Sequence, residues 1–503
     1  MTCCFFLSNT SFLFIVLSLL KSHDLYRSNK ITQNYRLYMH KDSKNKPLDV
    51  LIIGMGFSGV CSAIKLLEKN ITNIQIHEKS DGIGGTWHDN TYPGAACDVP
   101  SHLYCFTFEP NPNWSRRYAK QDEIKQYIEH CVEKYNIGNY ARYNSKVTQI
   151  HLDEKSGLWI VEFSDGRSIY THHVIHGGGG IHKPNIPSFE GLDDFDGAVI
   201  HTARWNHDIT LKDKRISIIG SAASAIQIIP EIAKIAKEVK VYQRTPNYII
   251  PRGDRAYTSK EKNLFRRFPW VLKLYRWFFY LRLELVTFPV IKKDSYIGKR
   301  AAKKIIQYIR KSIKDKSLHS IFEPEYDLGC KRILLSDDLF HAINKDNVKV
   351  VTSPIKRFES NCIVTSDLQT HDADVVVMAT GFDIKGHLYS IDIKGLNGKW
   401  LHQAWEKDAE AYRGCCVSGF PNFYMVTGPN TGAGTISLVH IIEQEVNYIV
   451  KLIELAGMTT HINVKQQCQD EYNLRIQKKL NDRVWSAGGC NSWYLSDTGK
   501  NIT

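Results

Sequence analysis

A short apolar run, three spaced glycines and a helical pattern follow one another in DVLIIGMGFSGVCSAIKLLEKN, which begins at Asp49. Gly54, Gly56 and Gly59 have the spacing G-x-G-x-x-G. In this pattern the first glycine makes the turn, the second admits a diphosphate, and the third lets the helix pack on its strand. Glu78 ends the next apolar run, where an acid can accept a hydrogen bond from a ribose hydroxyl. The stretch therefore predicts a dinucleotide-binding domain.

A second stretch of the same kind, ISIIGSAASAIQ, begins at Ile216 but lacks the second glycine. Its turn consists of Gly220, Ser221 and Ala222, and Ala225 is small enough for the third position. The methyl group of Ala222 lies where the backbone nears a diphosphate. We therefore expect a second nucleotide to bind here, but more weakly than a glycine would allow.

Composition narrows the class of protein. A chain of 503 residues is too long for one core and predicts two or three domains. The formal net charge is +13, but no dense basic run or nucleic-acid-binding signature accompanies it, so we expect no nucleic-acid partner. The twelve cysteines include no C-x-x-C pair, which argues against a zinc site and a dithiol redox motif. We expect reduced thiols, no metal and a cytoplasmic location.

Residues 1–46 form an N-terminal extension with two interpretations. The apolar run from Cys3 to Leu20 is interrupted by polar residues, and no Lys or Arg precedes it. Its uninterrupted part, from Phe12, is shorter than the about 20 residues that span a bilayer. A membrane anchor and a disordered extension both fit this pattern. Membrane association through this segment is therefore an alternative to a purely cytoplasmic protein.

Several further motifs carry a family resemblance. GIGGTWHDNTYPGAACDVPSHLYCFTF begins at Gly82, and FDGAVIHTARWNHD begins at Phe195. The second matches F-x-G-x-x-x-H-x-x-x-W and departs only at Asn206, where Pro or Asp is usual. Together with GCKRILLSDD and GGCNSWY, these stretches resemble the Baeyer–Villiger monooxygenases, a group of class B flavoprotein monooxygenases. The resemblance implies FAD on the first nucleotide domain, NADPH on the second, and oxidation of a small lipophilic ketone by dioxygen.

The resemblance also assigns residues to the site. Alongside the first glycine turn, it places on the flavin side Gly85, Thr86, Trp87, Asp98 and Tyr104. Arg332 matches the family's catalytic cation, with Asp98 as the carboxylate that positions it. A guanidinium suits the role because it cannot lose its proton and presents a planar fork to anionic oxygen.

The NADPH side is assigned in the same way. Arg244, with Thr245 beside it, follows the strand after the second turn, where positive charge selects the 2′-phosphate of NADPH. Lys331 matches a family residue with the same role. Trp493 matches one that lies against the nicotinamide nucleotide.

The expected fold is α/β, with two doubly wound dinucleotide-binding domains and a helical insert in the second. We expect the FAD domain at 47–185 and again at 375–503, the NADPH domain at 186–374, and the insert at about 257–327. Aromatic and basic residues alternate at near-helical spacing over 264–293. This stretch predicts a core helix pair, or alternatively a face toward a membrane or a lipophilic-substrate entrance.

Two other functions stay open at this point. One is oxygenation of a soft nitrogen or sulfur instead of a ketone. The other is a flavin- and NADPH-binding oxidase or redox module that no longer oxygenates. Ala222, the glycine run at 177–180 and the ending GKNIT, short of the family's usual Trp-Pro segment, favour the second. A disulfide reductase is unsupported, because no dithiol motif lies near the flavin residues.

Overall fold

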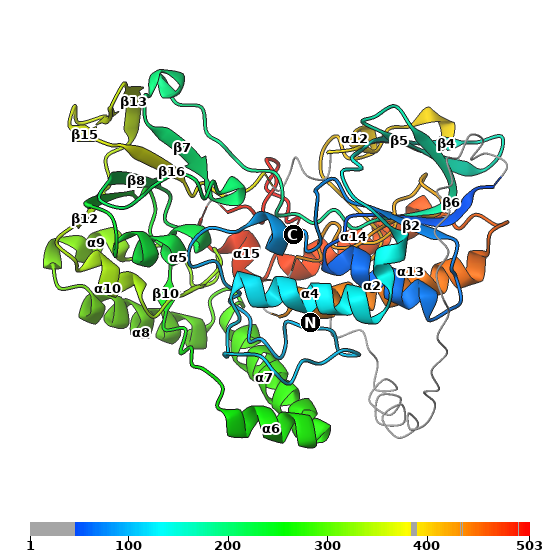
Figure 1. The fold of residues 1–503 in the computed structure, drawn as a ribbon, viewed down its shortest axis with the longest axis horizontal. Helices are drawn as coiled ribbons and strands as arrows, with labels where there is room; N and C mark the ends of the chain where they lie inside the picture. The colour runs from blue at the N-terminus through cyan, green and yellow to red at the C-terminus, as the bar shows by residue number, and fades with distance from the viewer. Residues whose placement is uncertain (1–45, 384–389, 433, 435, 491, 503) are drawn as a thin grey trace.

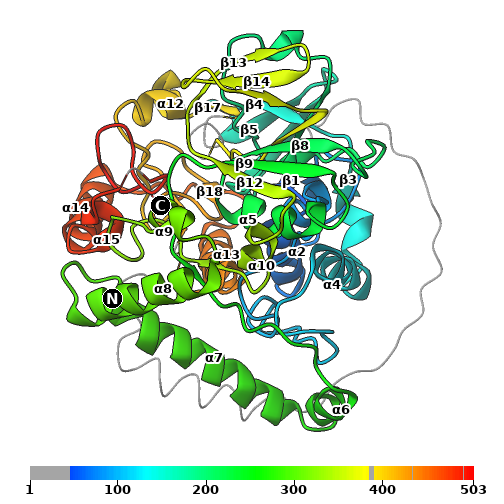
Figure 2. The same ribbon diagram turned by 90° about the vertical axis from the view of Figure 1, so that its left-hand side faces the viewer.

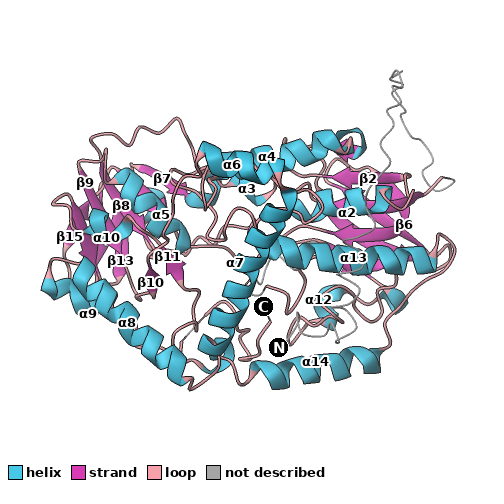
Figure 3. Ribbon diagram, turned by 90° about the horizontal axis from the view of Figure 1, so that it is seen from below, coloured by secondary structure: helices cyan, strands magenta, loops and turns pink. Residues whose placement is uncertain are grey.

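The protein folds into two lobes, each built around its own sheet (Figure 1). The computed structural model describes residues 46–383, 390–432, 434, 436–490 and 492–502. The first lobe holds an eight-stranded sheet and the second a five-stranded one. Figure 3 shows the two sheets at opposite ends of the molecule, with helices between and around them. The predicted α/β fold of two dinucleotide-binding units is confirmed.

The first sheet combines parallel and antiparallel pairing. Its order is β17-β4-β5-β6-β1-β2-β3, with β18 also pairing with β6. The run β6-β1-β2-β3 is parallel, whereas β5 is antiparallel to both β4 and β6. The strands are β1 (Leu48–Ile53), β2 (Ile74–His77), β3 (Ala141–Arg142), β4 (Val147–Asp153), β5 (Leu158–Phe163), β6 (Ser168–His176), β17 (Asp392–Lys394) and β18 (Phe423–Met425).

Apolar helices cover this sheet. α2 (Phe57–Leu67) is buried along most of its length, since it lies against the sheet and α13 (Leu438–Ala456). α4 (Gln121–Lys134) buries one face, whose apolar residues recur three or four positions apart. The other helices of this lobe are α3 (Thr86–Asp89), α12 (Leu401–Ala404), α14 (Gln466–Leu480), α15 (Val484–Ala487), η2 (Ile137–Tyr140) and η6 (Leu396–Gly398).

The second sheet is parallel throughout, in the order β12-β9-β8-β16-β7. Helices α5 and α10 pack on one face, and the antiparallel sheet β13-β14-β15 adjoins a separate apolar cluster. The elements are β7 (Ala198–His201), β8 (Arg215–Ile219), β9 (Glu238–Tyr242), β12 (Val348–Val351), β16 (Val375–Met378), α5 (Ala223–Ile232), α10 (Leu339–Ile343), β13 (Ile355–Glu359), β14 (Cys362–Thr365), β15 (Thr370–Asp372), η3 (Leu192–Asp194) and η4 (Thr202–Arg204).

The predicted boundary between the NADPH domain and the second part of the FAD domain needs a small shift. It was placed at residue 375, which is the first residue of β16, but β16 pairs with β7 and β8 in the second sheet. The chain therefore leaves the second lobe only after Met378. Two crossings between the lobes then run side by side, because Asn185 N donates to Gly381 O at 3.0 Å and Asp383 N donates to Lys183 O at 2.9 Å.

The insert of the second lobe is helical, and one of its helices has an exposed apolar face. It consists of α6 (Ser259–Arg267), α7 (Pro269–Val290), α8 (Tyr296–Ser312), η5 (Lys316–Leu318) and α9 (His319–Phe322), flanked by the short pair β10 (Ile249–Ile250) and β11 (Leu334–Leu335). Figure 2 shows α6 and α7 along one edge of the molecule. α7 buries Leu272, Phe279 and Val290. Along one side it exposes a row of apolar residues, called here the α7 stripe: Trp270, Leu274, Trp277, Phe278, Leu281 and Leu285. The predicted core helix pair is therefore correct for one face only.

The structure bears on two expectations from the sequence, namely that all cysteines are reduced and that a segment anchors the protein in a membrane. Cys330 and Cys490 form a disulfide, so the expectation of reduced thiols throughout was wrong. Sequence could not find this pair because 160 residues separate its members. Residues 1–45, for which an anchor and a disordered extension were the two interpretations, lie outside the described residues. Among the residues that are described, no helix is long and apolar enough to cross a membrane.

Candidate active site

Both glycine turns open into one large cavity between the lobes. Its volume is about 1930 Å³, and its walls include Gly54, Glu78, Gly220, Ala222 and Arg332. Single-ligand pockets usually measure about 300–1,000 Å³. This cavity therefore has room for more than one ligand, and it brings the residues predicted for both nucleotides to the same space.

The first turn has the geometry that the glycine pattern predicts. Gly54 has φ +96°, and a Cβ placed there would lie 2.9 Å from the carbonyl oxygen of Gly177. A Cβ on Gly59 would lie 1.8 Å from Gly54 O, so the helix packs on its strand only because this position is glycine. Gly56 is the N-cap of α2 and has no side-chain cap, which leaves amides at the start of the helix for an anion.

Glu78 is buried and already organises this turn. Its Oε2 accepts from Met55 N at 2.7 Å, and its Oε1 accepts from Ser80 N at 2.8 Å. Each carboxylate oxygen has a further lone pair, so the side chain can still accept from a ligand hydroxyl in the cavity it lines. The carboxylate thus has a structural task in addition to the predicted one.

The second turn repeats this backbone with different side chains. Gly220 has φ +121°, and a Cβ there would lie 2.3 Å from Ala379 O. Ala222 is the N-cap of α5, again without a side-chain cap, and its φ of −91° is an ordinary angle for alanine. Ala225 is fully buried against the strand. Ser221 Oγ donates to Thr245 O at 3.1 Å, which fixes the loop that carries Arg244.

The flavin-side residues form a connected aromatic wall in the first lobe. Trp87 Nε1 donates to Tyr104 OH at 3.2 Å, and the two rings meet edge to face with centroids 5.7 Å apart. Thr86 begins α3, and Gly85 precedes it with φ +53°. A Cβ on Gly85 would lie 3.2 Å from Gly56 Cα, so this loop adjoins the first turn closely.

Arg332 and Asp98 form a bidentate ion pair between the lobes. Arg332 Nε donates to Asp98 Oδ2 and its Nη2 donates to Oδ1, both at 2.8 Å. Burial raises the pKa of the Asp98 carboxyl, but the Arg332 guanidinium outweighs burial and lowers that pKa below its ordinary value. The pKa of Arg332 is raised by the same partner. The guanidinium is therefore a fixed cation on the cavity wall, as its predicted role requires.

A second, basic cavity adjoins the first at the second turn. Its volume is about 720 Å³, and its walls include Arg244, Thr245, Lys331, Cys490 and Trp493. Burial lowers the pKa of Lys331, and the nearby charge of Arg244 lowers it further. Because the positive charges of Arg244 and Lys331 repel each other, an anion bound between them would be stabilised. Trp493 is 39% exposed beside them.

Four residues that contribute here were missed from the sequence. Arg252 donates from Nη2 to Cys97 O at 2.8 Å and lowers the pKa of Asp98 as a second cation. Gln227 Nε2 donates to Ala96 O at 2.9 Å and thereby joins the two lobes. Asn247 Nδ2 donates to Ser221 O at 3.1 Å and so fixes the second turn. Gln243 follows β9 at the register that Glu78 occupies after β2. Only Gln243 had a usable signal, namely its place directly after an apolar strand.

The chain matches a known protein family over more than half of its length. A profile of the family described as flavin-binding monooxygenase-like matches residues 47–394. The chain is 40% identical over 459 residues to a Baeyer–Villiger monooxygenase of Pseudomonas aeruginosa, covering 90% of this chain and 86% of that protein. It belongs to the flavin-binding monooxygenase-like family. A Baeyer–Villiger monooxygenase of Streptomyces coelicolor is 37% identical over 462 residues, covering 90% of this chain and 88% of the relative.

Solved structures of the family match both lobes. Cyclohexanone monooxygenase from Rhodococcus sp. Phi1 bound to NADP+ superposes with a TM-score of 0.82 and 26% identity, covering 91% of this chain and 94% of that one. OTEMO in complex with FAD and NADP gives a TM-score of 0.81 and 25% identity, covering 90% and 94%. The resemblance to Baeyer–Villiger monooxygenases that the motifs indicate is confirmed by these matches.

Proposed function

We propose that this family member holds FAD on the first lobe and NADPH on the second, and uses dioxygen to insert an oxygen atom beside a ketone carbonyl. The observation that carries the proposal is the bidentate Arg332–Asp98 pair on the wall of a cavity that both nucleotide turns enter. The product is an ester, or a lactone when the ketone is cyclic.

The residues present fit two nucleotides. Gly54 and Gly59 leave space that a Cβ would fill, and the uncapped start of α2 offers amides to the diphosphate of FAD. Glu78 takes the ribose, and Trp87 and Tyr104 line the flavin. On the second lobe, the uncapped start of α5 takes the NADPH diphosphate. Arg244 and Lys331 take the 2′-phosphate, Thr245 lines the same cavity, and Trp493 covers the nucleotide.

The chain's own contribution to the reaction is electrostatic and steric. Reduced flavin supplies the chemistry that activates dioxygen. Arg332 holds the negative charge that develops on oxygen when the carbonyl is attacked, and Asp98 keeps its guanidinium plane fixed. Ile436, Leu438 and Ile442 line the same cavity and exclude water from it. Arg332 and Asp98 are accordingly the proposed catalytic pair.

The test is product formation from a matched panel of ketones, sulfides and amines with NADPH and air. Ketones are expected to yield esters or lactones. Turnover of sulfides or amines alone would overturn the ester-forming proposal in favour of nitrogen or sulfur oxygenation. Consumption of NADPH with hydrogen peroxide as the sole product would overturn it in favour of an oxidase or redox module, which the Ala222 methyl in the second turn favours.

A finer proposal concerns location. Exposed Lys273 and Arg282 flank the α7 stripe, and the whole chain carries a formal net charge of +13. Apolar residues flanked by bases on one exposed helix face match the surface of an anionic bilayer. We propose that this face docks on anionic lipid, which would bring the enzyme to lipophilic substrate. Whether residues 1–45 add to such binding stays a prediction.

Sedimentation with vesicles tests this attachment. Binding to phosphatidylcholine vesicles is expected to rise when phosphatidylserine is included and to fall in the variant Trp277→Ser/Phe278→Ser/Leu281→Ser. Leu455→Ser is the control, because Leu455 is an exposed apolar residue on α13, away from α7. Equal binding by the triple variant and the control would remove α7 from the interaction.

A further inference from the structure

The C-terminal segment after α15 lies between the lobes and is held mainly by the first one. Thr498 Oγ1 donates to Asp408 at 2.9 Å, Lys500 Nζ pairs with Glu410, and Asn430 N donates to Ile502 O at 3.0 Å. This segment carries Trp493 along the wall of the basic cavity. Its position over the second lobe therefore needs a separate attachment.

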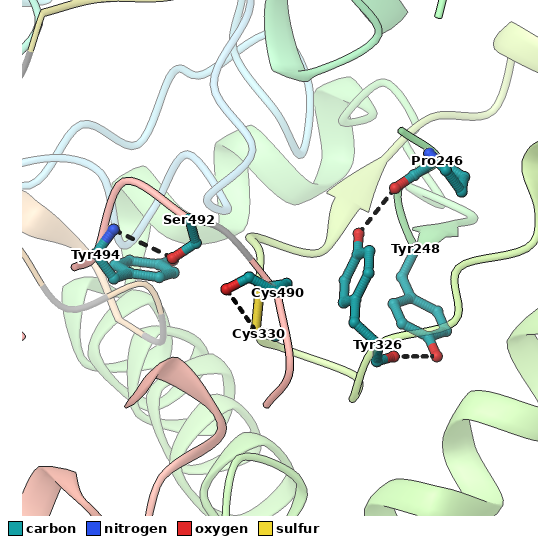
Figure 4. The surroundings of a disulfide bond; sticks show 7 residues. All are labelled: Pro246, Tyr248, Tyr326, Cys330, Cys490, Ser492 and Tyr494. Atoms are coloured by element: carbon teal, nitrogen blue, oxygen red, sulfur yellow. Dashed lines mark hydrogen bonds between the residues drawn. A yellow bond between two sulfur atoms is a disulfide. The ribbon is translucent and has the colours of Figure 1, made fainter. Parts of the chain in front are cut away.

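The disulfide between Cys330 and Cys490 provides that attachment (Figure 4). Cys330 directly precedes Lys331 and Arg332, and Cys490 lies three residues before Trp493. Beside the disulfide, Asp327 N donates to Gly488 O at 3.0 Å, which continues the contact by one backbone hydrogen bond. One covalent bond thus joins the loop that bears the catalytic cation to the segment that covers the nucleotide cavity.

The two cysteines differ in exposure. Cys330 is 1% exposed, whereas Cys490 is half-buried and lines the basic cavity together with Arg244 and Lys331. A thiolate reaching the disulfide would therefore attack Cys490 and release Cys330.

We propose that the Cys330–Cys490 pair is a redox-controlled positioning site for the nicotinamide nucleotide, an inference that rests on the proposed NADPH-dependent function. In the disulfide form, Ser492 and Trp493 are held against the cavity that Arg244 and Lys331 enter. In the dithiol form, only noncovalent contacts such as the Asp327 N–Gly488 O hydrogen bond tie the segment to the second lobe, and the nucleotide must order the part around Trp493 on binding. Pre-organisation of this kind raises affinity without adding a contact.

The redox steps balance with ordinary reagents. A dithiol reductant attacks Cys490 to give a mixed disulfide and a Cys330 thiolate, which takes a proton. The second thiol of the reductant then releases Cys490, so two electrons pass to the protein and the reductant becomes a disulfide. In the reverse direction, hydrogen peroxide takes two electrons from the two thiols and leaves as two molecules of water. Peroxide is the by-product of any flavin monooxygenase turnover that fails to reach substrate.

Affinity for NADP+ is the first test, measured by equilibrium dialysis of the FAD-loaded protein. Cys490→Ser and Cys330→Ser are expected to weaken NADP+ about 5- to 30-fold, which is about 1 to 2 kcal/mol. FAD content is expected to be unchanged. Cys468→Ser is the matched control, since Cys468 is an exposed free cysteine on α14. Affinities within about twofold of the control would overturn the proposal.

The wild-type protein provides a second test that does not depend on the variants folding. Because linkage is reciprocal, saturating NADP+ should shift the disulfide-to-dithiol ratio in a dithiothreitol redox buffer by the same factor. Alkylation and mass spectrometry measure that ratio. An unshifted ratio, or a pair that stays reduced after peroxide treatment, would overturn the inference. Both of these results would leave the proposed function intact, because that function is contradicted only if ketones yield no ester.

Discussion

The two nucleotide turns have almost the same backbone. Gly56 has φ −87° and ψ −165°, and Ala222 at the matching position has φ −91° and ψ −158°. Gly54 N donates to His77 O, just as Gly220 N donates to Tyr242 O. Since Ala222 adopts an unstrained angle, its methyl group costs nothing in the turn itself. Any effect of that methyl must come from its contact with a ligand.

The turns differ in the charge of the residues that follow their second strands. After β2 stands Glu78, which is buried and takes two backbone amides. At the same register after β9 stands Gln243, followed by Arg244. An acid at this place suits a ribose with free hydroxyls, whereas a cation suits a 2′-phosphate. Under the proposed function, the same turn geometry serves two nucleotides, and the side chain after the strand decides which one binds.

The largest expected effect concerns the ion pair that lies between the turns. Arg332→Ala should lower ester formation about 10² to 10³-fold and leave reduction of FAD by NADPH largely intact, because one fixed electrostatic donor is lost. Stopped-flow absorbance of the flavin and product analysis measure the two steps separately. The double variant Arg332→Ala/Asp98→Asn controls for the carboxylate left unpaired. Equal loss in both steps would mean that Arg332 serves nucleotide binding, not oxygen insertion.

Exchanging the charge of the second turn is the next test. Arg244→Ala should raise KM for NADPH about 10- to 100-fold, since a hydrogen bond between charged groups is lost, and should barely change KM for NADH. Gln243→Glu, which copies the first turn, should shift preference in the same direction. Arg255→Ala is a control, because Arg255 pairs with Glu261 on the surface. Equal changes for both nucleotides would break the proposed division between the turns.

How much of this was accessible from sequence depends on the distance between partners. The glycine turns and Glu78 lie within one strand–turn–helix unit, so local spacing was enough to find them. Arg332 and Asp98 are 234 residues apart, and only family resemblance brought them together. Nothing local revealed the Cys330–Cys490 pair or the side of α7 that faces out. Those depend on how distant segments fold back, which periodicity does not encode.

A smaller effect is expected from exchanging the methyl group between the turns. Ala222→Gly should tighten NADPH by up to about tenfold, and Gly56→Ala should weaken FAD by a similar factor. The apo fold should survive the second change, because a Cβ on Gly56 would meet Gly85 Cα at an ordinary 3.6 Å. Dissociation constants of both cofactors measure the exchange. An unchanged NADPH constant in Ala222→Gly would show that the diphosphate already clears the methyl.

The smallest effect is a pH dependence of the second turn. Burial and Arg244 lower the pKa of Lys331, so its charge is lost at lower pH than that of an ordinary lysine. The preference for NADPH over NADH should therefore decline as pH rises toward about 10. Lys331→Arg should keep the preference constant over that range, since arginine stays charged. A decline that persists in this variant would assign the titration to another group.

The ratio of ester formed to NADPH oxidised, measured on the purified FAD-bound protein with a broad ketone panel, tests the central claim most directly. The claim has two parts. The two turns, which share one backbone geometry, hold FAD and NADPH on either side of the Arg332 guanidinium. Electrons from NADPH on the second lobe are then used for oxygen insertion at the flavin on the first lobe. Equal amounts of ester and oxidised NADPH are expected for at least one ketone. NADPH oxidation that yields hydrogen peroxide and no ester across the whole panel would contradict it.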